Sequence, residues 1–182
     1  MTHRFAIQAS NPRTRATFDA TAENLSDAIE SVFLRETEYA LLIWNWICIP
    51  LSYKYDLSLM VDDIVDLVED MVRETMGHRM IHWPSNTFAS TWNVKWQDGK
   101  VMINATWECV LGKTEGLLAE RSMIAAELAQ FVGEWRRPLE VILAALERAG
   151  YRDDNLRGLS RMQDLVKGIE GTGILYTEPS PM

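Results

Sequence analysis

The strongest constraint on this chain is a two-residue alternation on either side of one dipeptide, Asp98-Gly99. Asp-Gly favours a two-residue type I′ turn, because both central residues of that turn need a positive φ. A turn there predicts a hairpin over residues 87–110 whose far end pairs Phe88 with Cys109. One face of the hairpin then carries Phe88, Ser90, Trp92, Val94, Trp96, Val101, Ile103, Ala105, Trp107 and Cys109. The opposite face is mostly polar, so we expect one buried face and one solvent face.

Length and composition are those of one ordinary globular domain. The chain has 182 residues, of which 47% are hydrophobic and 24% charged. No apolar run follows the first residues, so we expect no signal peptide, and the longest apolar run, residues 40–51, is too short to span a bilayer. Cys48 and Cys109 both lie in predicted strands, where we expect buried, unpaired thiols. A cytoplasmic location follows from these observations.

The best predicted helix covers residues 59–75. Its apolar arc consists of Met60, Val61, Ile64, Val65, Leu67, Val68, Met71 and Val72. The opposite arc consists of Asp62, Asp63, Asp66, Glu69, Asp70 and Glu74, with Arg73 as its only base. Such a separation is typical of an amphipathic helix on a protein surface. Ser58 or Asp56 is the expected N-cap.

Further elements complete a single α+β domain over residues 1–182, with 152–182 as a weakly patterned C-terminal tail. We expect strands at 4–9, 15–20 and 40–49, the last one central and unbroken, and an extended segment at 52–56. Expected helices begin after Asn24 and at about Ser122, and Pro138 kinks or breaks the second one. A connection at 78–86, a short helix at 160–167 and a strand-like segment at 174–176 are also expected. The predicted architecture is a mainly antiparallel sheet, centred on the Asp-Gly hairpin and covered by amphipathic helices.

Charge and motifs narrow the function. The net charge is −8, and residues 56–74 contain seven acids and one base, which argues against nucleic acid or an anionic membrane as partner. The run Asp62-Asp63-Ile64-Val65-Asp66 resembles the magnesium–diphosphate motif of isoprenoid synthases. Those enzymes are larger and all-helical, with a second acidic motif that this chain lacks. His78 and His82 have a spacing that could hold a metal on a helix, but no third ligand is evident. We therefore predict no catalytic residue, cofactor or metal site.

The segment from about 83 to 151 resembles bacterial toxin-immunity proteins, including those of contact-dependent growth inhibition systems. The resemblance rests on the Trp92–Trp96 strand, Asp98-Gly99, Ile103-Asn104-Ala105-Thr106-Trp107, Gly112, Phe131-Val132-Gly133-Glu134-Trp135 and Ala149-Gly150-Tyr151. It implies a small, cytoplasmic, non-enzymatic protein that binds and blocks one cognate toxin domain. Many such toxins are basic nucleases, which an acidic inhibitor would attract electrostatically.

The expected partner-binding residues are Asp62, Asp63, Asp66, Glu69 and Asp70 on the acidic arc, together with Tyr53 and Tyr55. The acids could equally form an ordinary solvated helix face. Two other classes of function remain open. One is a small-molecule-binding protein or enzyme that uses a tryptophan-lined pocket over the buried face of the hairpin. The other is a structural subunit of a larger assembly.

Overall fold

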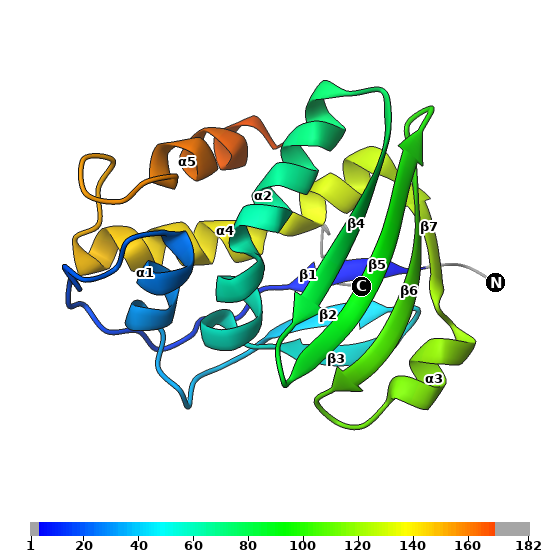
Figure 1. Cartoon of the computed structure of the whole chain (residues 1–182), viewed down its shortest axis with the longest axis horizontal. Coiled ribbons are helices and arrows are strands. Elements are labelled where there is room, and N and C mark those ends of the chain that lie inside the picture. Colours follow the sequence, from blue (N-terminus) through cyan, green and yellow to red (C-terminus); the bar gives the residue numbers. More distant parts are fainter. Residues whose placement is uncertain (1–3, 170–182) are drawn as a thin grey trace, which may run out of the picture.

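Two antiparallel sheets form the frame of the computed structural model, which describes residues 4–169 (Figure 1). The first sheet has the order β1-β2-β3 and the second the order β4-β5-β6-β7. The strands are β1 (Phe5–Gln8), β2 (Ala40–Trp44), β3 (Ile47–Leu51), β4 (Met76–Pro84), β5 (Phe88–Gln97), β6 (Lys100–Val110) and β7 (Met123–Glu127). The helices are α1 (Leu25–Val32), α2 (Ser58–Arg73), α3 (Glu115–Glu120), α4 (Leu128–Ala149) and α5 (Leu159–Gly168). The predicted α+β class and antiparallel pairing are confirmed.

The Asp-Gly hairpin is formed by β5 and β6. Asp98 and Gly99 have φ values of 51° and 74°, as a type I′ turn requires. The predicted register holds as far as Ser90, which faces Trp107, but it shifts between Ala89 and Ser90. Because of that irregularity, Phe88 faces Val110 instead of Cys109. Cys109 is consequently exposed, and the prediction of a buried thiol was wrong.

The apolar run at 40–49 is a second hairpin, so the prediction of one central strand was wrong. The β2 and β3 strands meet at Asn45 and Trp46, whose φ values are 48° and 72°. An apolar run alone does not distinguish one long strand from two short ones, and Asn45 is the residue that suits the first turn position. Cys48 is turned outward on β3 and is exposed, although it too was expected to be buried.

Several further segments differ from their predictions. Residues 15–20 do not pair with β1, whose partner is β2. Residues 53–57 form a π-helical turn instead of an extended segment. There the Asp56 carboxylate accepts a hydrogen bond from the Ser52 backbone N–H at 2.6 Å, so Asp56 does not cap α2. Ser58 does not cap it either, because the N-cap residue is Leu57, without a side-chain bond. The predicted connection at 78–86 is mostly strand β4.

The long helix begins later than expected and is not broken. Residues 123–127 form β7, which pairs with β6, and α4 starts at Leu128. Pro138 lies inside α4, which continues to Ala149 and ends at Gly150 with φ 101°. The short C-terminal helix α5 agrees with the prediction for 160–167. The strand predicted at 174–176 lies outside the described residues.

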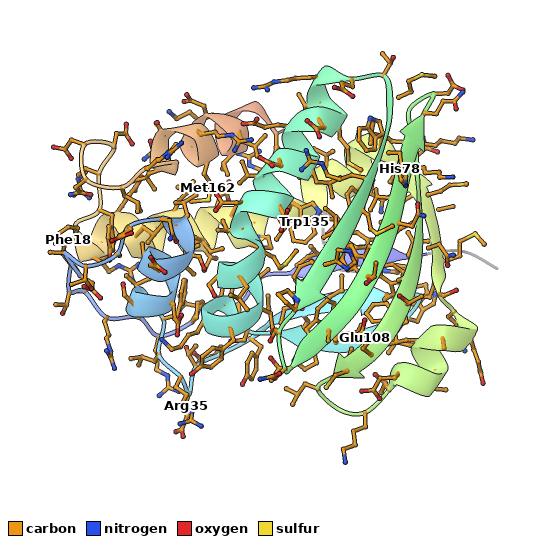
Figure 2. The ribbon with its side chains drawn as sticks, in the orientation of Figure 1. Phe18, Arg35, His78, Glu108, Trp135 and Met162 are labelled. Carbon is orange, nitrogen blue, oxygen red and sulfur yellow. The ribbon has the colours of Figure 1, made fainter. Side chains whose placement is uncertain are left out.

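Aromatic rings fill the space between the sheets and α4. They are contributed by Phe5, Trp44, Trp83, Phe88, Trp92, Trp107, Phe131 and Trp135. Phe5 lies 4.6 Å from Phe131 between ring centroids, and Trp83 lies 5.1 Å from Trp92. Figure 2 labels Trp135 in this interior. The buried face of the Asp-Gly hairpin is therefore occupied by the protein's own rings, which leaves little support for a tryptophan-lined ligand pocket.

Within residues 4–169, none of the helices combines the length and the apolar character that a membrane span needs.

Candidate functional site

Three of the six acids on the acidic arc of α2 form ion pairs with arginines from other elements. Arg79 on β4 donates to Asp66 at 3.2 Å and contacts Asp70 at 2.7 Å. Arg161 on α5 donates to Asp66 at 2.6 Å and forms two hydrogen bonds to Glu69, at 3.0 and 2.8 Å. These carboxylates hold β4 and α5 against α2. The helix itself contains few bases because its acids pair with Arg79 and Arg161, which come from other parts of the chain.

The protonation behaviour of these acids agrees with internal pairing. Burial works against ionisation of Asp66, but hydrogen bonds from Arg161 and Arg79 outweigh it and lower the pKa of that carboxyl. The hydrogen bonds from Arg161 also lower the pKa of Glu69, which is buried. The carboxylates of Asp66 and Glu69 therefore stabilise the fold and are little available to bind a partner.

Asp62 and Asp63 remain exposed, as does Glu74 at the C-terminal end of the arc. The pKa of Asp62 is raised by partial burial of its carboxyl group and by the neighbouring charge of Asp66. Neither Asp62 nor Asp63 forms an ion pair within the described part of the chain. Of the five predicted acids, these two are the ones still placed to attract a basic partner.

The two predicted tyrosines do not form an exposed pair. Tyr53 is completely buried and stacks on Phe33 at 5.0 Å between ring centroids. Its hydroxyl accepts a hydrogen bond from the Ser10 backbone N–H at 3.2 Å, and burial raises its pKa. A partner cannot reach it, so the prediction for Tyr53 was wrong. Tyr55 is half-buried, with the Lys54 ammonium 5.7 Å from its ring centre.

The two histidines lie on β4, where a spacing of four residues separates side chains along one face. His78 hydrogen-bonds Asn93 at 2.9 Å and His82 hydrogen-bonds Thr91 at 3.0 Å. Four strand residues span about 13 Å, too far for two ligands of one ion. No group of three His, Cys, Asp or Glu side chains suited to a metal occurs among residues 4–169.

The outer face of the four-stranded sheet, to which these histidines belong, was expected to face solvent but was not predicted as a binding site. Paired positions across β4, β5, β6 and β7 form rows. The rows are Met76–Gln97–Lys100–Glu127, His78–Lys95–Met102–Ala125, Met80–Asn93–Asn104–Met123 and His82–Thr91–Thr106. We call these positions the open sheet face. All of them are exposed or half-exposed, while their neighbours along each strand are largely buried.

Charge and hydrophobicity are unevenly distributed over the open sheet face. Its four methionines are 49–58% exposed. In the three rows below the first, Lys95 is the one side chain with a formal charge at neutral pH, whereas the first row carries Lys100 and Glu127 at the sheet's end. An open depression of about 1010 Å³ lies at this end, over Met76, Met102 and Glu127 (Figure 2 labels His78 beside it). Exposed methionines among mostly uncharged polar side chains are typical of a protein-binding surface.

The Asn45-Trp46 turn lies next to one corner of this face. The Asn45 amide donates to the backbone carbonyls of Arg121 and Met123, at 2.9 and 2.7 Å, and Met123 belongs to the face. Trp46 projects outward with 64% of its surface exposed. An Asn inside an apolar run marks a possible break, so Asn45 was a weak signal for this turn. The open face was predictable from the alternation in β5 and β6, but β4 and β7 were not recognised as strands.

No protein-family model, curated protein or solved structure matches this chain.

Proposed function

We propose that this chain is a non-enzymatic binding protein of the immunity type, which docks one cognate toxin domain on the open sheet face and blocks it. The observation that carries the proposal is the composition of this face, which exposes four methionines among mostly uncharged polar side chains, with Lys95 as the one charged residue outside the first row. The resemblance to immunity proteins covers residues 83–151, which include three of the four strands of the face. This resemblance is the reason for proposing a toxin domain as the class of partner.

Association with a basic toxin would be steered by the charge of the whole molecule. The net charge is −8, and steering depends on the summed field more than on any single contact. Asp62 and Asp63 contribute exposed, uncompensated charge to that field. Docking itself would depend on the open sheet face, where burial of the methionine side chains supplies the binding free energy.

The experiment introduces charge into the centre of the face. In the variant Met80→Glu with Met102→Glu, two carboxylates would be desolvated on binding, so we expect the dissociation constant to rise by roughly 30-fold or more. Binding is measured by biolayer interferometry against the purified toxin domain encoded beside this chain, and inhibition by survival of cells that express that toxin. The matched control is Val72→Glu, which adds a carboxylate at another exposed apolar side chain, on α2.

The control variant should bind and protect as the wild type does, and all variants should retain their melting temperature within about 2 °C, as surface substitutions do. Wild-type affinity in the double variant would exclude the open sheet face as the docking surface. A toxin domain that does not bind the wild-type chain would overturn the proposed function itself.

A further inference from the structure

Trp46 occupies a backbone position that suits glycine and disfavours a bulky side chain. Its φ is 72°, in the left-handed region, and it is the second central residue of a type I′ turn. Side chains at such positions crowd the following carbonyl oxygen, and tryptophan lacks the short polar side chain with which asparagine or aspartate can compensate by a local hydrogen bond. A glycine at position 46 would fit this turn better.

The turn is nevertheless held firmly by its neighbours. The Asn45 side chain accepts a hydrogen bond from the Arg4 backbone N–H at 3.1 Å, in addition to its two bonds to the β7 segment. The guanidinium of Arg121 donates to the Asn45 carbonyl at 3.2 Å. Because these bonds fix the backbone, the direction in which the Trp46 side chain leaves it is also fixed, and only the two torsions of the indole remain to be ordered on binding.

The fold gains little from the Trp46 ring. With 64% of the residue exposed, its described contact is the guanidinium carbon of Arg4, which lies 4.8 Å from the ring centre. Arg4 is half-exposed, and Arg121, which donates to the Asn45 carbonyl, is exposed, so two positive charges lie at the turn. Tryptophan and arginine are the residue types most enriched among the side chains that dominate binding energy at protein interfaces.

We propose that Trp46 is an anchor that inserts into an apolar pocket on the partner protein, bordered by a carboxylate that pairs with Arg4. The inference rests on the proposed function, because the partner is the same protein. Continuity supports it, since the turn is bonded directly to Met123 on the open sheet face. The positive charge at the turn, on a protein of net charge −8, defines the complementary chemistry of the pocket rim.

The test compares two substitutions to glycine at left-handed positions. Trp46→Gly relieves the backbone and removes the ring, so we expect an unchanged or higher melting temperature and a dissociation constant raised by about 30-fold or more. Lys113→Gly is the matched control, because Lys113 is exposed with φ 55° in the turn after β6. It should stabilise similarly and bind normally. Arg4→Gln should weaken binding less, by roughly 3- to 10-fold, with most of the loss disappearing at high salt.

Two results would overturn the anchor. A fall in the melting temperature of Trp46→Gly by more than about 5 °C would mean that the ring serves folding. Wild-type affinity in Trp46→Gly would exclude the ring from the interface. If that variant binds normally while Met80→Glu with Met102→Glu binds weakly, the anchor is wrong and the proposed function stands. If the toxin domain fails to bind the wild-type chain, both are wrong.

Discussion

The two hairpins of this protein have nearly the same turn but reach it by different means. The central φ values are 51° and 74° at Asp98-Gly99, and 48° and 72° at Asn45-Trp46. The first turn lies in solvent, and a Cβ on Gly99 would meet nothing within 4 Å. The second is tied to Arg4 and to the segment before β7 by hydrogen bonds. Local turn chemistry therefore suffices for one hairpin, whereas contacts distant in sequence impose the same geometry on the other.

The largest effect should come from the first central residue of the Asn45-Trp46 turn. Asn45→Ala removes three side-chain hydrogen bonds at a buried residue, so we expect a loss of about 3 kcal/mol in the free energy of unfolding. Asp98→Ala removes one exposed bond, to Gln97, and should cost less than about 1 kcal/mol. Urea denaturation of both variants measures the difference. Equal losses of unfolding free energy in the two variants would contradict the conclusion that distant contacts stabilise only the Asn45-Trp46 turn.

An intermediate effect should follow from Gly99→Val. A β-branched side chain at φ 74° strains the backbone, and since it meets no neighbour the strain is the whole cost, of about 1–3 kcal/mol. Thermal unfolding followed by circular dichroism checks this value. Gly99→Asn should lose much less, because asparagine tolerates the left-handed region. A valine variant as stable as the wild type would show that the solvent-exposed turn is not needed to set the register of β5 and β6.

The smallest effect concerns the edge of the three-stranded sheet, which contains the Asn45-Trp46 turn. The buried Glu134 carboxylate on α4 accepts a hydrogen bond from the Ile7 backbone N–H at 2.9 Å, at the outer edge of β1. Burial raises the pKa of Glu134, although the Ile7 N–H and the charge of Arg4 oppose the rise. The folded state thus retains this proton to higher pH than the unfolded state. The contribution of Glu134 to stability must therefore decline as pH rises from its ordinary pKa through the raised one.

Glu134→Gln keeps an oxygen acceptor for Ile7 and removes the ionisation. Relative to the wild type, the variant should gain stability as pH rises from about 4 to 8, by less than about 1 kcal/mol. Denaturant melts across that range measure the slope. A difference between variant and wild type that does not change with pH would mean that Glu134 has the same pKa in both states.

The features that sequence could predict are those whose cause is local. Asp98-Gly99 carries its own turn preference, and the alternation on both sides continues it, so β5 and β6 were recognised. The break at Asn45 was hidden within residues 40–49, because what stabilises it comes from Arg121 and Met123, more than 70 residues away.

The pairing of Asp66, Glu69 and Asp70 within the fold was missed for the same reason. Its counter-ion Arg79 follows Asp66 by 13 residues and Arg161 follows it by 95, so the helix sequence alone looked uncompensated. Tyr53 looked exposed because a π-helical turn is not signalled by any periodicity. Sequence therefore located the charges, and the three-dimensional structure decided which of them were available.

The exposed indole at position 46 also gives this protein a natural optical label. Of its seven tryptophans, five are at most 3% exposed, Trp107 is half-buried and Trp46 is 64% exposed. An indole in water emits at longer wavelength than one in an apolar interior, and dissolved iodide reaches only the former by collision. The long-wavelength emission of the native protein therefore reports on one hairpin tip, and it does so without any added dye.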